Sequence, residues 1–234
     1  MFLGLTIKHN KSQYIAEFIG TFFLVFFGCG AAILASLQPN VMSHSGVSVV
    51  FGGVVSVMIY ATGHISGAHF NPAVTLSFWI TKKFPSKRVI GYLLAQLLGA
   101  FLASLIHMII WGTNHSFGET SFESTIVIGF MVEFILSFVL MFVIHSVATD
   151  SRAIGELAGI AIGSTVAICA FVGGPLTGAS MNPARSIAPA IFSGEVTLLW
   201  VYILSPILGA MAGALVYEWI KCTKESEDES HGCC

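Results

Sequence analysis

Charge is the property that this sequence has least of. Only 9% of its 234 residues are Asp, Glu, Lys or Arg, whereas an average soluble domain has about 25%. Because so little charge cannot cover a surface that faces water, a soluble enzyme and a disordered chain both fit poorly. The net charge of −2 also supplies no basic field for an anionic polymer, so no nucleic-acid partner is expected.

Paired cysteines in loops are also missing, which argues against a small disulfide-stabilised fold. Cys29 and Cys169 lie within apolar runs, and the other three cysteines lie near the C-terminal end. The residues present in excess are apolar, since 55% of the chain is hydrophobic, with 19 Phe and 24 Gly. A mean hydropathy of +0.85 is typical of transmembrane helices. The composition therefore predicts an all-α protein that crosses the bilayer several times.

Six stretches are long and apolar enough to cross a bilayer, which takes about 20 residues each. The first is too long and too rich in Phe for a cleavable signal peptide, so it is kept as a span. The predicted spans lie near 13–36, 43–62, 88–110, 125–147, 155–173 and 197–220.

The basic residues predict the orientation of these spans. If both termini are cytoplasmic, every Lys and Arg except Arg185 falls on the cytoplasmic side, as the positive-inside rule requires. Arg185 therefore needs a separate explanation. The residues that define the cytoplasmic side are Lys8, Lys11, Lys82, Lys83, Lys87, Arg88, Arg152, Lys221 and Lys224. We expect a multi-pass protein of the plasma membrane, meaning the cell or inner membrane.

The last residues, 221–234, read KCTKESEDESHGCC and show no apolar periodicity. Their composition favours a flexible, solubilising cytoplasmic tail. Lipid modification at Cys233 and Cys234, or a role in trafficking, stays open because nothing specific in the sequence supports or excludes it.

The sequence contains an internal repeat with three matching segments. AEFIGTFFLVF around Glu17 matches VEFILSFVLMF around Glu133, and YLLAQLLGAF from Tyr92 matches YILSPILGAM from Tyr202. Each half holds three spans, and this odd number inverts the second half relative to the first. Inverted repeats are typical of channels and transporters, although a duplication without such a function would leave the same trace. We predict one domain over 1–234, with repeat one at about 12–110 and repeat two at about 125–220.

The third matching pair is HISGAHFNPAVT at 64–75 and PLTGASMNPARS at 175–186. It lies within two short segments, 63–80 and 174–192, that are expected to begin with irregular, Gly-rich backbone. Asn is a favoured N-cap and Pro suits the first helical position. Each triplet should therefore start a helix, capped by Asn71 or Asn182 and beginning at Pro72-Ala73 or Pro183-Ala184.

About ten residues follow each triplet, which at 1.5 Å per residue is roughly 15 Å, or half the hydrocarbon core. Two such half-helices entering from opposite sides would meet near the midplane. One copy of the triplet indicates little, but two copies in matching contexts of an inverted repeat are specific. The matching segments that begin at Tyr92 and Tyr202 contain Gly99 and Gly209. These two glycines, together with Gly213, are expected at close helix contacts.

With these paired motifs the chain resembles the major intrinsic proteins, the aquaporins and aquaglyceroporins, over essentially residues 12–220. The resemblance implies the aquaporin fold, with six transmembrane helices and two re-entrant half-helices in a 3+3 inverted repeat. It also implies a homotetramer with one pore in each subunit. No enzymatic activity, cofactor or metal is expected.

The resemblance also implies how a pore would be lined. The side-chain amides of Asn71 and Asn182 would act as donors at its centre. Two helix N-termini aimed at one point place roughly +0.5 charge each there, and such a field excludes cations in aquaporin-type pores. Irregular backbone at membrane depth is tolerated where it lines a watery cavity. The carbonyl acceptors are expected at Gly67, Ala68, His69, Gly178, Ala179 and Ser180.

The charged residues inside the predicted spans and half-helices have two interpretations each. Arg185 could be a membrane anchor whose side chain reaches the surface, but its place in the first turn of a half-helix, where the dipole disfavours a cation, favours a role in the pore. Glu17 and Glu133 could form the proton relay of a coupled transporter. However, no chain of ionisable residues joins them, and the resemblance implies that they accept backbone N–H bonds from the re-entrant segments.

Four positions set the outer constriction in this family, and by the resemblance they are Phe51, Ala170, Ala179 and Arg185. Water-selective members usually have His at the position of Ala170, so a wider and less polar opening than a strict water filter is expected. Ser186 and Ala190, however, depart from the residues that glycerol facilitators usually have. Tyr202-Ile203, with GTFFLVFFGCG at 20–30, looks most like the nodulin-26-like branch.

We therefore expect a passive channel for water and small uncharged solutes such as glycerol that excludes ions and protons. A strict water channel and a facilitator for metalloid acids or other neutral solutes remain alternatives. An ion-coupled transporter would need acidic groups at the midplane, where the triplets supply neutral Asn. A membrane enzyme would need a base beside Ser180, and no His or Lys accompanies it.

Overall fold

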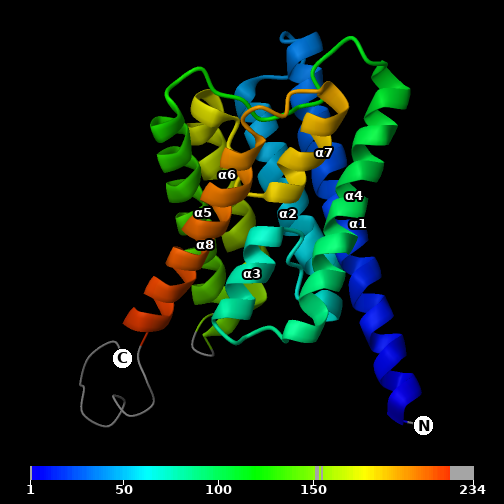
Figure 1. Cartoon of the computed structure of the whole chain (residues 1–234), viewed down its shortest axis with the longest axis vertical. Coiled ribbons are helices and arrows are strands. Elements are labelled where there is room, and N and C mark those ends of the chain that lie inside the picture. The colour runs from blue at the N-terminus through cyan, green and yellow to red at the C-terminus, as the bar shows by residue number, and fades with distance from the viewer. Residues whose placement is uncertain (1, 151–152, 154, 222–234) are drawn as a thin grey trace.

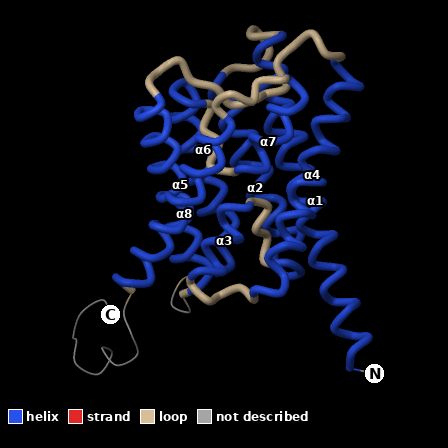
Figure 2. Tube along the Cα trace, in the orientation of Figure 1, coloured by secondary structure: helices blue, strands red, loops and turns tan. Residues whose placement is uncertain are grey.

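The structure is a computed structural model that describes residues 2–150, 153 and 155–221, with side chains described from residue 10 onward. Within these residues the chain is helical, without strands (Figures 1 and 2). From 222 onward, the predicted tail lies outside the described residues, as does Arg152. The elements are α1 (Phe2–Leu37), α2 (His44–Ser66), α3 (Pro72–Ile80), α4 (Ser86–Trp111), α5 (Ile126–Thr149), the 3-10 turn η1 (Gly155–Leu157), α6 (Ala158–Thr177), α7 (Pro183–Ser193) and α8 (Leu199–Ile220).

Six of these helices are long and apolar enough to cross a membrane, and they coincide with the six predicted spans. The all-helical architecture is therefore confirmed. Helix α1 begins earlier than expected, because no proline interrupts the polar segment that precedes the first apolar run. The remaining two helices, α3 and α7, have 9 and 11 residues and are the predicted half-helices.

The irregular segments are shorter than the sequence suggests. We expected irregular backbone from residues 63 and 174, but α2 continues to Ser66 and α6 to Thr177. Each helix ends only at a glycine in the left-handed conformation, Gly67 with φ 87° and Gly178 with φ 77°. Glycine is favoured at this position after a helix, because without a Cβ atom it adopts the left-handed conformation at no steric cost.

The two repeats pack by the same rules. Helix α1 lies on α4 as α5 lies on α8, and α1 contacts α2 as α5 contacts α6. Half-helix α3 packs on α8 of the other repeat, just as α7 packs on α4, while α2 and α6 cross each other between the repeats. In Figure 1, α3 enters from the end that holds the start of α1 and the end of α8, and α7 enters from the opposite end. The two half-helices thus point their N-termini towards the middle.

Glycines set how closely these helices approach. A Cβ atom at Gly99 would lie 2.3 Å from the carbonyl oxygen of Phe18, and one at Gly209 would lie 2.2 Å from that of Phe134. Real Cβ atoms cannot sit so close to backbone, so α4 on α1 and α8 on α5 require glycine at these crossings. The structure confirms the close contacts predicted for both residues.

Replacing Gly209 by Ala should destabilise the protein, because the added methyl group meets backbone that cannot rotate away. Overpacking of this kind lowers the free energy of unfolding by about 1–3 kcal/mol. The matched control is Gly53→Ala, since a Cβ at Gly53 meets nothing within 4 Å, and it should be neutral or slightly stabilising. Thermal unfolding in detergent measures both variants. Equal stability of the two would contradict the proposed crossing.

Candidate functional site

The two Asn-Pro-Ala triplets start α3 and α7 as the sequence predicts. The side-chain oxygen of Asn71 accepts a hydrogen bond from the backbone N–H of Ala73 at 2.8 Å. The oxygen of Asn182 accepts from Ala184 at 3.0 Å and from Arg185 at 3.4 Å. Pro72 and Pro183 occupy the first helical positions, where a missing N–H costs nothing. Each Asn oxygen is thus fixed to its own helix, which turns the amide nitrogen away from that helix.

The amide nitrogens join the two repeats. Asn71 Nδ2 donates to the carbonyl oxygen of Met181 at 2.7 Å, and Asn182 Nδ2 donates to that of Phe70 at 2.9 Å. The half-helices therefore meet tip to tip inside the protein. A side-chain amide has two N–H groups, so each Asn keeps a second one. Both side chains also line one cavity of about 110 Å³.

The backbone before each triplet is held in an uncommon conformation. Ala68 and Phe70 have φ of 52° and 49°, and Ala179 and Met181 have φ of 43° and 53°. Non-glycine residues adopt positive φ only where the surrounding structure holds them. No pattern in the sequence predicts this conformation at Phe70 or Met181.

Two buried carboxylates hold these turns. Glu17 Oε1 accepts from the backbone N–H of His69 at 2.9 Å, and Oε2 accepts from that of Phe70 at 2.7 Å. Glu133 accepts in the same way from Ser180 and Met181, at 2.9 Å each. These are the hydrogen bonds to the re-entrant segments that the family resemblance implies.

Further side chains donate hydrogen bonds to each carboxylate, and sequence reasoning missed them. Glu17 also accepts from Ser66 Oγ and Gln96 Nε2, both at 2.7 Å, and Glu133 accepts from Thr177 Oγ1 at 2.7 Å. In addition, two tyrosine hydroxyls each donate at 2.7 Å to the carbonyl of the last residue of the helix that leads into the turn, α2 or α6. The pairs are Tyr92 with Ser66 and Tyr202 with Thr177. A signal was available, because the two tyrosines begin the matching segments YLLAQLLGAF and YILSPILGAM of the internal repeat.

Arg185 lies inside the protein and is only 3% exposed. Its Nη1 donates to the carbonyl oxygen of Gly118 at 2.7 Å, and its guanidinium carbon lies 5.1 Å from the ring centroid of Phe51. A membrane anchor would instead extend towards the surface. The burial therefore excludes the anchor interpretation.

The connection between α4 and α5 reaches into the site, which the sequence gave no reason to expect. Besides the Gly118 carbonyl, it contributes Thr120, whose hydroxyl shares a hydrogen bond with Ser186 Oγ at 2.8 Å. Ser186 in turn shares one with Ser180 Oγ at 2.6 Å. A Cβ at Gly118 would lie 2.8 Å from the carbonyl oxygen of Cys29, so the connection is pressed against α1. It ties the polar side of the site to the outer end of the molecule.

Four cavities follow one another through the protein and share lining residues. We name the cavities by the ends of the molecule: outer is the end from which α7 enters, and inner is the end that holds the start of α1 (Figure 1). The outer cavity, of about 440 Å³, shares Phe51 with the next, of about 40 Å³. That small cavity shares Asn182 with the one of about 110 Å³, which in turn shares His69 with an inner cavity of about 760 Å³. The row thus has its largest cavities at both ends and its smallest near the tips of the half-helices. We call the 40 Å³ cavity the constriction.

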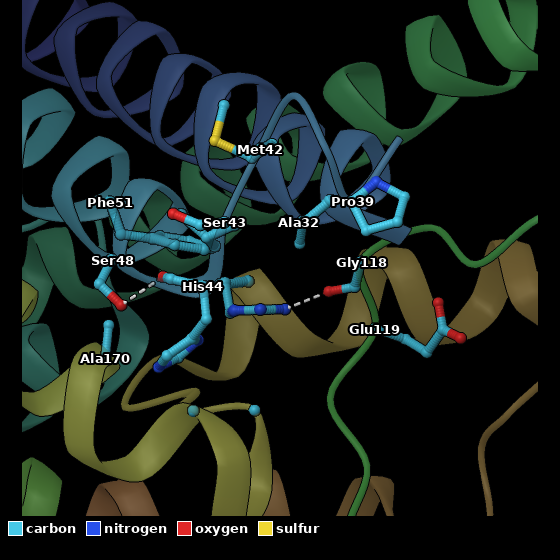
Figure 3. Close-up of a pocket in the computed structure, with 15 residues that line it drawn as sticks. Ala32, Pro39, Met42, Ser43, His44, Ser48, Phe51, Gly118, Glu119 and Ala170 are labelled. Carbon is cyan, nitrogen blue, oxygen red and sulfur yellow. Dashed lines mark hydrogen bonds between the residues drawn. The ribbon is translucent and has the colours of Figure 1, made fainter. Parts of the chain in front are cut away.

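The constriction has one apolar and one polar wall. Phe51, Ala170, Ala179 and Arg185, the four predicted filter residues, all line it. Helices α1, α2 and α6 add apolar side chains, whereas Ser180, Asn182 and Arg185 supply polar groups. Figure 3 shows the outer cavity above it, with Phe51 and Ala170 on one side and Gly118 and Glu119 on the other. The structure brings all four filter residues to one place.

The residues expected to supply carbonyl acceptors also lie along the row of cavities. Gly178 lines the outer cavity, and Ala179 and Ser180 line the constriction. On the other side of the Asn pair, the cavity of about 110 Å³ is lined by Gly67, Ala68 and His69.

Replacing Glu17 by Gln should destabilise the protein, because an amide group offers one acceptor oxygen where four donors converge. Either orientation of the amide leaves the N–H of His69 or Phe70 without a partner, at a cost of about 1–3 kcal/mol per buried group. Denaturant or thermal unfolding in detergent measures the loss. Glu123→Gln, at an exposed position, is the control and should resemble the unmodified protein. Equal stability of the two variants would contradict the role of Glu17 in holding the turn.

Known proteins resemble this chain in sequence. The family model for the major intrinsic proteins matches residues 5–217. Aquaporin NIP1-1 of Zea mays is 50% identical over 214 residues, which is 91% of this chain and 76% of that protein. Nodulin-26 of Glycine max is 47% identical over 219 residues, covering 93% of this chain and 81% of that one. These relatives agree with the predicted likeness to the nodulin-26-like branch.

A solved structure is similar throughout. The X-ray structure of the aquaglyceroporin from Plasmodium falciparum superposes with a TM-score of 0.79 at 28% sequence identity, covering 91% of this chain and 97% of that one. The half-helices that meet at Asn71 and Asn182 are thus part of a shared fold. Together with the family model, these matches establish that the chain belongs to the major intrinsic protein family.

Proposed function

We propose that the four cavities form one path and that the protein is a passive channel for water and small uncharged solutes such as glycerol. One observation carries this proposal: the four residues expected to form a filter line the smallest of the four cavities, next to Asn182. The relatives named above are aquaporins, and the solved structure is that of an aquaglyceroporin. Both support a path for neutral molecules.

Permeation requires that the path replace the hydrogen bonds that a solute loses on leaving bulk water. In this proposal, carbonyl oxygens of the two strained turns accept from the solute, and the second N–H groups of Asn71 and Asn182 donate to it. Each of these contacts is an ordinary neutral hydrogen bond, whose net contribution is about 0.5–1.5 kcal/mol. Since no single contact binds the solute tightly, it is released quickly.

Cations meet an opposing electrostatic field in the constriction and at the tips of the half-helices. The N-termini of α3 and α7 each contribute roughly +0.5 charge where they meet, and the buried guanidinium of Arg185 adds a full positive charge. Among the described residues, none that lines the constriction carries a carboxylate. Both oxygens of Glu17 and both of Glu133 already accept hydrogen bonds, so neither is free for a coupled ion. This arrangement supports a passive channel over an ion-coupled transporter.

The walls of the constriction support solutes larger than water. Ala170 and Ala179 contribute only methyl groups, and Phe51 adds an aromatic face. An apolar wall suits the CH and CH₂ groups of glycerol, while the polar wall suits its hydroxyl groups.

Stopped-flow shrinkage of proteoliposomes, first with an impermeant osmolyte and then with glycerol, tests the proposed channel function directly. Water flux no faster than in empty vesicles would contradict the channel, and water flux without glycerol flux would favour a strict water channel.

The end that holds the start of α1 and the end of α8 is proposed to be cytoplasmic, and both chain termini with it. The connection between α3 and α4 lies at this end (Figure 1) and contains Lys82 and Lys83, and the first turn of α4 adds Lys87 and Arg88. Lys83 pairs there with Glu218 near the end of α8, at 3.3 Å. The positive-inside rule then assigns this end to the cytoplasm, and we propose the plasma membrane as the location. The family resemblance also supports a homotetramer with one path in each subunit.

Replacing Ala170 by His should reduce glycerol flux more than water flux, because the imidazole fills space in the constriction that Ala170 lines. We expect glycerol flux to fall roughly tenfold, which corresponds to about 1.4 kcal/mol added to the barrier. Ala170→Ser, which adds only a hydroxyl group, is the control and should retain most of the glycerol flux. Stopped-flow light scattering measures both fluxes on one sample. An equal loss of water and glycerol flux would contradict the filter assignment.

Replacing Arg185 by Val should raise the leakage of protons or cations, because it removes the one positive charge that the described part of the chain places in the lining of the constriction. Arg185→Lys keeps a positive charge and should stay close to the unmodified protein. A pH-sensitive dye inside proteoliposomes, with an imposed membrane potential, reports proton leakage. Unchanged leakage in the Val variant, with water flux retained, would count against the barrier role.

A further inference from the structure

Phe51 is the constriction residue whose position most affects the width. Ala170 and Ala179 have only methyl groups, and the guanidinium of Arg185 is held by the Gly118 carbonyl. The ring of Phe51 lines both the constriction and the outer cavity. A shift of this ring therefore changes the opening more than a small shift of the other three side chains would.

The ring rests on helix α1 at Gly28. A Cβ atom there would lie 2.2 Å from Cε1 of Phe51, 2.5 Å from Cδ1 and 2.7 Å from Cζ. Leu24, one turn before Gly28, lines the constriction, and Ala32, one turn after it, lines the outer cavity. At the level of Gly28, α1 presents no side chain, and the ring from α2 fills that space.

Gly28 differs from the glycines at helix crossings. The atoms nearest to a Cβ at Gly99 or Gly209 belong to backbone, whereas the three nearest to Gly28 all belong to the ring of Phe51. In the inverted repeat, Gly28 matches Ile144 and Phe51 matches Ile162, and both isoleucines line the cavity of about 110 Å³. The repeated architecture thus accepts a large residue at this position. It is the ring of Phe51 that requires glycine at residue 28.

The Phe51 ring also contacts Arg185. The guanidinium carbon of Arg185 lies 5.1 Å from its centroid, within the range of about 6 Å for a cation–π interaction. Carbon atoms in contact normally lie about 3.5–4.0 Å apart. A methyl group at residue 28 would therefore push the ring away from α1 by more than about 1 Å. The open space that the ring borders is the path itself.

We propose that Gly28 is a specificity-determining residue: by lacking a Cβ atom, it seats the Phe51 ring against α1 and keeps the constriction wide enough for glycerol. This inference rests on the proposed channel function. Gly28 touches no solute and acts through Phe51. The width available to a solute is thus set partly by a residue that lies behind the wall of the path.

The test is a double-mutant cycle on proteoliposomes, with water and glycerol flux measured on the same samples. Gly28→Ala should lower the ratio of glycerol to water flux about fivefold or more, because the displaced ring raises the barrier for the larger solute more than that for water; a fivefold fall corresponds to about 1 kcal/mol. In the Phe51→Ala background, where no ring can be displaced, Gly28→Ala should leave the ratio unchanged. Gly53→Ala, whose Cβ meets nothing within 4 Å, is the matched control and should also leave it unchanged.

Two results would overturn the proposal. One is a ratio of glycerol to water flux that stays the same or rises in Gly28→Ala, and the other is an equal fall in the Phe51→Ala background. If Gly28→Ala does not fold, thermal stability replaces flux as the measurement. The double variant Gly28→Ala/Phe51→Ala must then fold, because removing the ring removes the clash with the added methyl group. These outcomes are separate from failure of the proposed function. A protein without glycerol or water flux before any substitution would contradict the channel itself.

Discussion

A broken helix inside a bilayer has no water to satisfy its exposed backbone groups, and this constraint governs the whole structure. The two half-helices satisfy it by bonding to each other and to buried side chains. Each Asn caps its own helix with its oxygen and bonds to the other repeat with its nitrogen. The turns before them bond to Glu17 and Glu133. The groups that could donate to or accept from a solute are those left over when these bonds are made.

The repeats supply a nearly symmetric scaffold, but the filter is asymmetric. Three of its residues, Phe51, Ala170 and Arg185, match Ile162, Ile59 and Val74 in the other repeat, and these three line the cavity of about 110 Å³ on the inner side. One half of the path thus has an arginine and an aromatic ring where the other half has aliphatic side chains. The same backbone geometry therefore carries different side chains on its two sides.

The sequence predicts the features that depend on local chemistry and on repetition. Lengths of apolar sequence locate the six spans, and the Asn-Pro pairs locate the starts of α3 and α7. The family resemblance identifies the filter residues that the structure brings together. The sequence does not predict the Gly118 carbonyl that accepts from Arg185, because a backbone carbonyl has no sequence signature. The seat at Gly28 was missed for a related reason, since it depends on a ring 23 positions further along the chain.

The central claim is that two broken helices meet inside the bilayer and leave donors facing one continuous path. A high-resolution structure of the protein in lipid, with its waters resolved, measures this most directly. The account predicts an unbroken file of waters through the four cavities, with the second N–H of Asn71 and of Asn182 each about 2.7–3.2 Å from a water oxygen. Separated Asn side chains, or a constriction closed to water, would contradict it.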